Sequence, residues 1–334
     1  IDFKYIANLY SPSTIDKCFL HDGKGKIPGF KEEQEESDGR LAFNWGVSGH
    51  KSRIININAE QLKIFANLYD SKRTSYNEAR LPIIHNQELI NVLKIFNKQP
   101  IRLRDIDNQY YTTHCWDESG AQKDGTIKRK TKFPIQSENM ILSGPHIYVA
   151  NPYYKTPKRE CKKNSDYKTI DLTTISNDYL PRTNYLPACN QQVYKNKAPK
   201  ISFEYKNHSQ SGSFFSYNKI VFRRRIGPTS ERTLCGALYP SMIAHIDGCF
   251  SITFKDQHKM LLLCGLAASI IYDFYVKLSG KNDFRNELAK NFPIISPKFS
   301  SKIKGRILVL CSISNLYSNI WMDLYLNDYN KISW

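Results

Sequence analysis

The stretch from 214 to 293 constrains the fold of this 334-residue chain more than any other. Tyr217 to Arg225 alternates like a β-strand, a Gly-Pro turn follows, and residues 234–254 supply further strand-like segments. An apolar segment over 259–278 then predicts a long helix, and a proline-ended segment closes the unit. Strands followed by long helices indicate an α+β fold.

The apolar run inside that helix reaches only from Met260 to Ile271. A membrane span needs about 20 apolar residues, and here Asp273 and Lys277 follow soon after the run. We therefore expect a buried helix and no membrane partner. The chain begins with Ile1 and no secretory leader follows, so we expect a fragment of a longer polypeptide.

The length predicts two domains. We expect a mixed helix and strand part over 1–140 and a β-rich part over 141–334 that ends in long helices. In the first part, Asn58 is a predicted N-cap for a helix through Tyr69, and residues 86–98 repeat the amphipathic pattern. Near the end of the chain, apolar residues at helical spacing predict an amphipathic helix over 304–326.

The charge favours a polyanionic partner. With 48 Lys+Arg against 31 Asp+Glu the formal charge is +17, which favours nucleic acid first and an anionic membrane second. A basic solvated surface without a partner is the alternative. The eight cysteines are scattered without a CxxC pair, so we expect free thiols, a cytoplasmic protein and no metal site.

Arginine side chains mark the central strand. Ile220 and Phe222 share one face of it, which leaves Val221, Arg223 and Arg225 on the other. The planar guanidinium fork suits bidentate contact with guanine edges or phosphates. The candidate base or phosphate contacts are Arg223, Arg224, Arg225 and Arg232.

A second group of basic residues precedes this strand. Asp124-Gly125 between polar segments predicts a hairpin whose second strand is lysine-rich. Such a hairpin tracks a phosphate backbone, or its lysines protect a sheet edge. The polar segment 160–212 is either an ordered functional loop or a connector. The candidate phosphate contacts are Lys128, Arg129, Lys130, Lys155, Lys158 and Arg182.

Six segments in succession together resemble one family. They are NWGVSGHKSRIININ, THCWDESGAQKDGTIKRKTKFP, SGPHIYVANPYYKTPKREC, IDLTTISNDYLPRTNYLPACN, FRRRIGPTSERTLCGALYP and RILVLCSISNLYSNIWMDLY. These segments resemble the carboxy-terminal half of large adenine-specific DNA methyltransferases of restriction-modification and phage-defence systems. The apolar helix and the closing Asn-Phe-Pro-Ile are also similar to target-recognition domains of specificity subunits.

The resemblance implies sequence-specific binding of double-stranded DNA. In that family the amino-terminal half binds S-adenosylmethionine and carries Asn-Pro-Pro-Tyr, and the other half recognises the sequence. Here the corresponding residues, Asn151 to Tyr154, have Tyr153 in place of the second proline, and no glycine-rich cofactor loop precedes them. We therefore expect no catalytic residue and no cofactor in this chain, and the catalytic region or other defence subunits as its protein partners.

Two other functions remain open. A nuclease would need clustered carboxylates to bind magnesium, and the candidate ligands are Asp105, Asp107, Asp117 and Glu118. The sequence around them contains no evident nuclease motif. A protein-interaction module would use the 304–326 helix, if the stripe of Ile313, Leu316 and Ile320 is uncovered.

Overall fold

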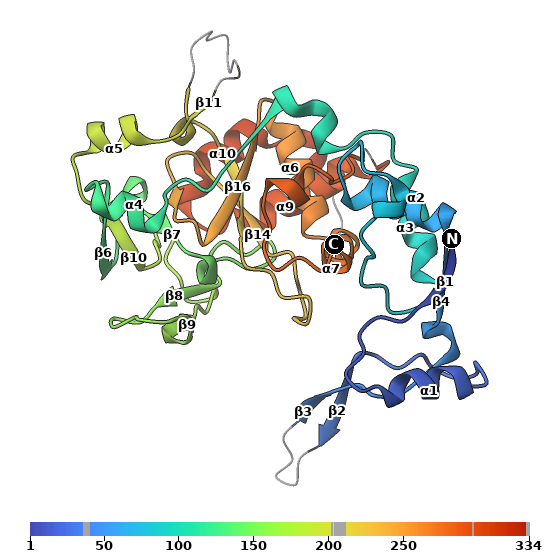
Figure 1. Cartoon of the computed structure of the whole chain (residues 1–334). Helices are drawn as coiled ribbons and strands as arrows, with labels where there is room; N and C mark the ends of the chain where they lie inside the picture. Colours follow the sequence, from blue (N-terminus) through green and yellow to red (C-terminus); the bar gives the residue numbers. More distant parts are fainter. Residues whose placement is uncertain (36–40, 202, 204–211, 296, 332–334) are drawn as a thin grey trace. The chain divides into compact units, whose positions relative to one another are not determined.

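The chain divides into two compact units (Figure 1). The computed structural model describes residues 1–35, 41–201, 203, 212–295 and 297–331. Both units contain helices and strands, so the α+β class is confirmed. The first unit is Ile1–Arg102 with Leu278–Gly280, and the second is Leu103–Lys277 with Lys281–Trp334.

The boundary between the units lies earlier in the chain than the predicted position near residue 140. The reason is β5 (Tyr110–Thr113), which pairs antiparallel with β16 (Cys249–Phe254). This long-range pairing joins the segment after Leu103 to the second unit. Alternation in the sequence indicates a strand but not its partner.

The first unit is built around a short strand pair and a capped helix. β1 (Asp2–Tyr5) pairs antiparallel with β4 (Ile55–Asn58), and α2 (Ala59–Tyr69) begins directly after it. Oδ1 of Asn58 accepts from the backbone N–H of Glu60 at 2.8 Å, and the Gln61 side chain accepts from that of Asn58 at 3.2 Å. This capping box confirms the predicted N-cap. The other elements are α1 (Ser13–Leu20), β2 (Lys31–Glu35), β3 (Leu41–Trp45), η1 (Lys51–Arg53), η2 (Tyr76–Glu78) and α3 (Leu89–Asn97).

Two four-stranded sheets organise the second unit. The first has the order β14-β13-β16-β5 and is antiparallel throughout. The second has the order β15-β7-β10-β6, with β15 and β7 parallel. Their remaining strands are β6 (Ile127–Lys132), β7 (Ile141–Leu142), β10 (Thr183–Pro187), β13 (Lys219–Arg223), β14 (Gly236–Tyr239) and β15 (Ala244–His245).

Shorter elements connect these strands. The two-stranded ribbons are β8 (Lys155–Pro157) with β9 (Tyr167–Thr169) and β11 (Lys200–Ile201) with β12 (Gly212–Ser213). Residues 202 and 204–211 of the predicted 160–212 loop lie outside the described part of the chain. The short helices are η3 (Leu103–Gln109), α4 (Glu118–Lys123), η4 (Ser137–Asn139), η5 (Gly144–His146), η6 (Asn164–Asp166), α5 (Gln191–Lys197), η7 (Phe214–Ser216), α8 (Asn286–Ala289), η8 (Asn315–Tyr317) and η9 (Asn327–Lys331).

The predicted helix over 259–278 is two helices. α6 (Gln257–Ala267) and α7 (Ile270–Leu278) meet at a bend of 74°. α6 lies against β13, β14 and β16, and α9 (Ser300–Cys311) lies against α6 and β14. Gly265 permits the close approach of α6 to α9, because a Cβ there would come within 2.4 Å of Cγ2 of Ile303. In the part of the chain that the structure describes, no single helix is long and apolar enough to cross a membrane.

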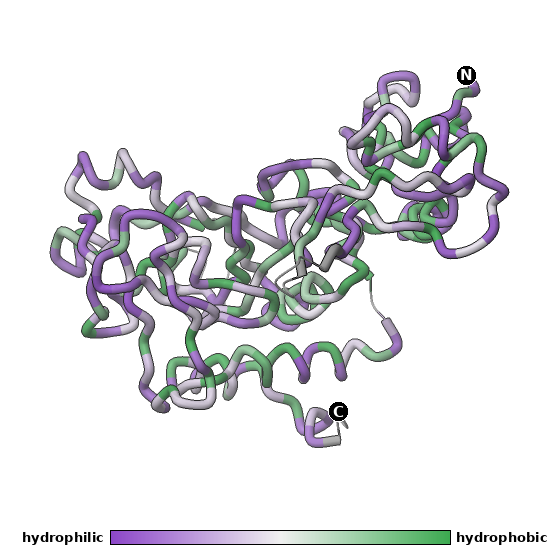
Figure 2. The backbone as a smooth tube through the Cα atoms, turned by 90° about the horizontal axis from the view of Figure 1, so that it is seen from below, coloured by the Kyte–Doolittle hydropathy of each residue, from purple (hydrophilic) through white to green (hydrophobic). Residues whose placement is uncertain are grey.

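The predicted helix over 304–326 is also interrupted. α9 ends at Cys311, and α10 (Ser318–Leu324) begins after η8. Hydrophobic and hydrophilic turns alternate along the segment that leads to the C terminus (Figure 2). Ile320 is fully buried, while Ile313 and Leu316 are partly buried. The stripe is therefore largely covered within its own unit, which removes the main support for a docking helix.

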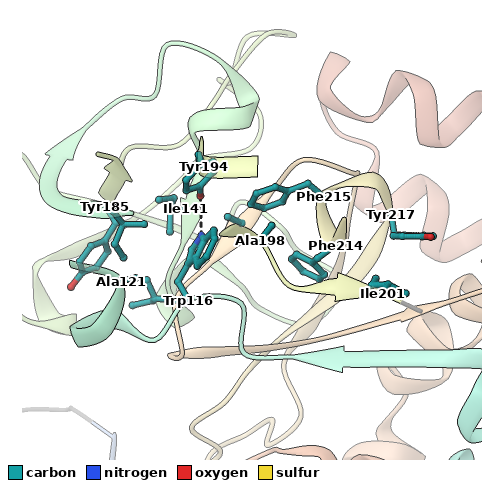
Figure 3. Close-up of a cluster of buried hydrophobic side chains, with 13 residues drawn as sticks. Trp116, Ala121, Ile141, Tyr185, Tyr194, Ala198, Ile201, Phe214, Phe215 and Tyr217 are labelled. Carbon is teal, nitrogen blue, oxygen red and sulfur yellow. Dashed lines mark hydrogen bonds between the residues drawn. The ribbon is translucent and has the colours of Figure 1, made fainter. Parts of the chain in front are cut away.

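A separate aromatic core lies beside the second sheet. It includes Trp116, Tyr194, Phe214 and Phe215, all at least nine-tenths buried (Figure 3). Nε1 of Trp116 donates to the hydroxyl of Tyr194 at 2.9 Å. Burial of these large rings, with their polar atoms paired, stabilises α4 and α5 against the sheet.

Candidate nucleic-acid interface

The arginine cluster begins where β13 leaves the first sheet. Arg223 is the last residue of the strand, and Ile220, Val221 and Phe222 before it are fully buried. Val221, which the alternation places on the same face as Arg223, is buried because β13 lies between β14 and β16 and both its faces are covered. The arginine side chains reach solvent only where the strand ends.

Arg223 is held without a carboxylate. Its Nε donates to the backbone carbonyl of Gly144 at 3.1 Å. Its guanidinium carbon lies 5.4 Å from the ring centroid of Tyr154 and 5.6 Å from that of Tyr148, and the two rings stack at 4.8 Å. Among the described residues it forms no ion pair, so its positive charge is not neutralised by a neighbouring side chain.

Arg224 and Arg225 are paired with acidic residues. Arg224, whose side chain is 17% exposed, forms an ion pair and a hydrogen bond with Asp247. Arg225 is 74% exposed and lies 3.2 Å from Asp283. Exposed pairs of this kind contribute little to stability, about 0–1 kcal/mol, so Arg225 can exchange its partner for another anion at low cost.

His114 and Arg285 complete this polar network. Nδ1 of His114 lies 3.1 Å from Asp247, and Nε2 lies 3.3 Å from Nη1 of Arg285. Burial is the main cause that lowers the pKa of His114, and Arg285 and Arg224 lower it further, while Asp247 opposes them. His114 is therefore neutral at pH 7, and the network carries more arginine than carboxylate charge.

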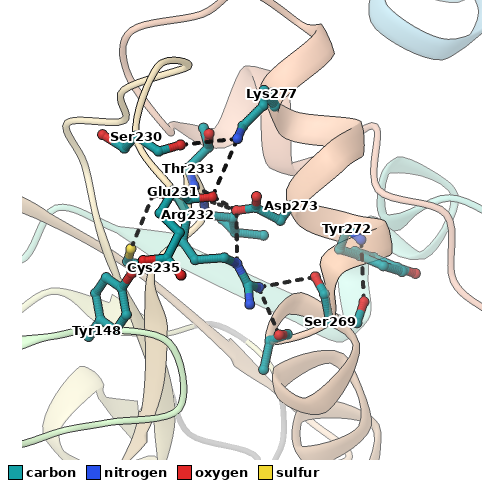
Figure 4. A network of polar contacts seen from close by, with 12 residues as sticks. Tyr148, Ser230, Glu231, Arg232, Thr233, Cys235, Ser269, Tyr272, Asp273 and Lys277 are labelled. Carbon is teal, nitrogen blue, oxygen red and sulfur yellow. Dashed lines mark hydrogen bonds and ion pairs between the residues drawn. The ribbon is translucent and has the colours of Figure 1, made fainter. Parts of the chain in front are cut away.

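Arg232 belongs to a second network, shown in Figure 4. It forms an ion pair with Asp273 at 3.5 Å and donates to the carbonyls of Ala268 and Ser269 at 2.8 and 3.2 Å. Asp273 also accepts from the backbone N–H groups of Thr233 and Leu234, both at 2.7 Å. These contacts fasten the loop before β14 to the junction of α6 and α7. Arg232 therefore has a structural role, and Arg224, which is mostly buried against Asp247, is also engaged within the fold.

A pocket of about 420 Å³ brings together residues from five parts of the second unit. Its cationic lining is Arg223, Arg225 and Lys155, and Glu118 of α4 also lines it. Gly144 and Gly248 line the pocket with backbone atoms alone, because they have no side chains. The other lining residues are Ser143, Pro145, Asn164 and Ile246. In the sequence analysis, Arg223 and Arg225 belong to one group of candidates and Lys155 to another. No signal in the sequence indicated that the three share a pocket.

The β8–β9 ribbon beside the pocket carries further cations. It extends from the body of the second unit (Figure 1), and Lys155 of β8 and Asn164 of η6 belong to both ribbon and pocket. Lys158, one of the predicted phosphate contacts, is exposed. Sequence reasoning missed four other exposed cations here: Arg159, Lys162 and Lys163, for which the short run KRECKK was the available signal, and Lys168.

The connection of this ribbon is ordered by local and long-range contacts. A carboxylate oxygen of Asp166 accepts from the backbone N–H groups of Lys162 and Lys163 at 2.9 and 3.0 Å. Nη2 of Arg129 donates to the carbonyl of Cys161 at 3.3 Å, and Nδ2 of Asn184 lies 3.3 Å from its sulfur. The lysine side chains are thus presented from a fixed backbone.

The lysine-rich strand β6 exists, but the predicted hairpin does not. The residues before Gly125 form α4 instead of a strand, and Gly125, with φ of 71°, follows the end of this helix. β6 pairs with β10 and is the edge strand of its sheet. Lys128, Lys130 and Lys132 are exposed along it, so both alternatives of the sequence analysis, edge protection and phosphate contact, stay open.

Two predicted phosphate contacts are engaged in the fold. Arg129 is half-exposed, lies 4.0 Å from Oε1 of Glu118 and donates to the hydroxyl of Tyr185 at 3.3 Å. Arg182 donates to the carbonyl of Pro157 at 3.2 Å, and its guanidinium lies 4.6 Å from the ring centroid of Phe133. Both arginines connect β6 and β10 to the ribbon.

The Asn-Pro-Tyr-Tyr segment is part of the core. Oδ1 of Asn151 accepts from the backbone N–H of Tyr153 at 2.9 Å. Tyr153 is fully buried, its hydroxyl lies 2.9 Å from Oγ of Ser314, and burial raises its pKa to about 12. Only Tyr154 lies beside the pocket residues, through its contacts with Arg223 and Lys155. Asn151 and Tyr153 are thus both engaged in hydrogen bonds within the fold.

The acidic residues considered for a nuclease are used differently. Asp117 caps α4, with Oδ1 accepting from the N–H of Gly120 at 2.7 Å. Glu118 accepts from the hydroxyl of Tyr185. The pKa of that hydroxyl is raised, mainly by burial and further by the neighbouring Glu118 carboxylate. Among the described residues, no group of three or more His, Cys, Asp or Glu side chains is placed to hold a metal ion.

No family model matches this chain, and no curated protein is significantly similar to it. The features that point to a function therefore lie in the geometry of the second unit.

Proposed function

We propose that this chain binds double-stranded DNA sequence-specifically, as the target-recognition region of an adenine-specific DNA methyltransferase of restriction-modification or phage defence. The observation that carries the proposal is the pocket in which Arg223, Arg225 and Lys155 meet beside the basic β8–β9 ribbon. Methyl transfer and S-adenosylmethionine binding belong to a separate catalytic region, which is the expected protein partner in the cytoplasm.

The distribution of charge supports a backbone-following contact. Exposed cations on the ribbon and on edge strand β6 flank the pocket in the same unit, so several can meet successive phosphates. Phosphate contacts fix the position of a protein on the duplex, while base contacts select the sequence. The proposed contacts are Arg223, Arg225, Lys155, Lys158, Arg159, Lys162, Lys163, Lys168, Lys128 and Lys130.

The test is selection of a randomised duplex library by the full chain at two salt concentrations, followed by sequencing of the retained DNA. We expect an enriched motif and binding that weakens steeply with salt. The matched control is Lys302→Ala, which removes an exposed cation of α9 outside the proposed surface. Salt-sensitive binding without a motif would assign specificity to the catalytic region, and an absence of binding would refute the proposal.

A further inference from the structure

The pocket has two cations that no carboxylate of the described residues neutralises. Arg223 has only carbonyl and aromatic neighbours, and Nζ of Lys155 lies 4.9 Å from the ring centroid of Tyr154 without an ion pair. Arg225, the third cation, already has Asp283 as a partner. A pocket with this excess of positive charge attracts an anionic group such as a phosphate.

The two unpaired cations are also held in position. The Nε contact with Gly144 and the stacked rings of Tyr148 and Tyr154 fix the guanidinium plane of Arg223 and leave its terminal nitrogens for a ligand. Tyr154 contacts the ammonium group of Lys155 as well. Side chains ordered before binding lose less conformational entropy when the ligand arrives, which favours affinity.

The carboxylate of Glu118 makes this more than a phosphate site. Its Oε1 accepts from the Tyr185 hydroxyl and lies 4.0 Å from Nη1 of Arg129, whereas Oε2 has no partner among the described residues. A carboxylate oxygen that lines a pocket accepts hydrogen bonds and repels a second anion. The complementary ligand therefore has a phosphate at one end and N–H donors at the other, as a nucleotide does.

The concave shape decides how a nucleotide meets these groups. Base edges in a duplex lie at the floor of a groove about 8.5 Å deep, where protruding elements reach them and the lining of a pocket does not. A nucleotide outside the base stack can enter a pocket of about 420 Å³. Guanine fits Glu118 best, because its N1–H and N2 amino group are adjacent donors, whereas adenine and cytosine place an acceptor nitrogen beside their amino group.

We propose that the pocket between Arg223, Lys155 and Glu118 binds a single unstacked guanine nucleotide, with its phosphate at the two cations and the base amino edge at Oε2 of Glu118. The nucleotide is either free or part of a DNA strand. The strand-borne source depends on the proposed DNA-binding function, and the free source does not.

The experiment measures binding of inorganic phosphate, dGMP and dTMP to the full chain by calorimetry. It also measures binding of a fully paired duplex and of the same duplex with one unpaired guanosine by fluorescence anisotropy. We expect dGMP to bind at least about tenfold more tightly than phosphate or dTMP, since hydrogen bonds to charged groups contribute about 1.5–3 kcal/mol each. Binding of the unpaired guanosine in preference to the paired duplex identifies the strand-borne source.

Three variants locate the ligand. Glu118→Gln keeps an oxygen for the Tyr185 hydroxyl but removes the charge, and should weaken dGMP about tenfold without weakening phosphate. Arg223→Ala should weaken both ligands. Gly248→Leu should block dGMP sterically: a Cβ at Gly248 would meet only ordinary contacts at 3.7 Å or more, so the backbone accepts a side chain at this position. Lys302→Ala is the unchanged control.

The outcomes separate this inference from the proposed function. Duplex binding together with equal affinities for dGMP, dTMP and phosphate, or with no effect of Glu118→Gln, would overturn the nucleotide pocket and leave DNA binding intact. Binding of dGMP that Glu118→Gln weakens, without any duplex binding, would support a free-nucleotide pocket and reject the proposed function.

Discussion

Nε of Arg232 lies 3.5 Å from Oδ1 of Asp273, and the two side chains are 19% and 6% exposed. Arg223, nine residues earlier, has no carboxylate partner among the described residues and lines an open pocket. Two arginines of one sequence cluster therefore serve different purposes. One holds a loop to the helix junction, and the other remains available to an anion.

Arg232→Ala should destabilise the protein. It leaves the buried Asp273 carboxylate without its counter-charge, and loss of one partner of a buried pair costs about 3–5 kcal/mol. Urea denaturation followed by circular dichroism measures the change in the free energy of unfolding. Arg225→Ala is the matched control, because its side chain is 74% exposed and its loss should change stability by no more than about 0.5 kcal/mol. Equal effects of the two variants would contradict the structural role of Arg232.

Removal of ribbon lysines should change the salt dependence of DNA binding. Lys158→Ala and Lys163→Ala each delete one exposed cation next to the pocket, so each should lower the slope of log affinity against log salt by about one. The loss should be the same on cognate and random duplexes, since phosphates carry no sequence information. Anisotropy titrations from low to moderate salt check this. If the slopes match those of the intact chain and of Lys302→Ala, the ribbon does not contact the backbone.

Lys219 should make stability rise with pH. It is fully buried, its Nζ donates to the carbonyl of Ile243 at 3.2 Å, and burial lowers its pKa from 10.5 to about 7. Between these values the unfolded chain binds a proton that the folded chain does not, so the free energy of unfolding increases from about pH 7 to about pH 10.5. Below pH 7 the full cost of burying the charged ammonium group is present.

Lys219→Met tests this prediction, because it keeps the length of the side chain without the charge. Denaturation midpoints measured across the same pH range should rise less steeply in the variant than in the original chain. Parallel pH profiles for the two proteins would show that Lys219 does not titrate in this range.

Tyr194→Phe should weaken the aromatic core. The variant keeps the ring that stacks on Phe215 at 5.3 Å but removes the only acceptor that the described residues offer to Nε1 of Trp116. A buried donor without a partner costs about 1–3 kcal/mol. Thermal unfolding should show the lower stability, and Tyr148→Phe, at a partly exposed ring, serves as the comparison. A midpoint unchanged from that of the original chain would contradict this account of the core.

Sequence reasoning was most successful where neighbours along the chain set the structure. The Asn58 cap and the helix it begins are correct because the donor and acceptor groups of a capping box lie within three residues. It was less successful with long helices. Apolar spacing predicted one helix over 259–278, but the chain bends by 74° after α6. At this bend Arg232, which belongs to a loop distant in the sequence, donates to the carbonyls of Ala268 and Ser269.

The candidate site follows the same division. The residues themselves fix its charge: the sequence was enough to predict an α+β chain with a strongly basic character and an arginine cluster in a strand-like segment. Which arginine stays unpaired depends on Asp247, Asp273 and Asp283, which lie far along the chain from the arginines they meet. The pocket likewise unites Glu118, Lys155 and Arg223. Ion pairs and pockets require groups to be close in space, and only the packing of the sheets and helices brings such distant residues together.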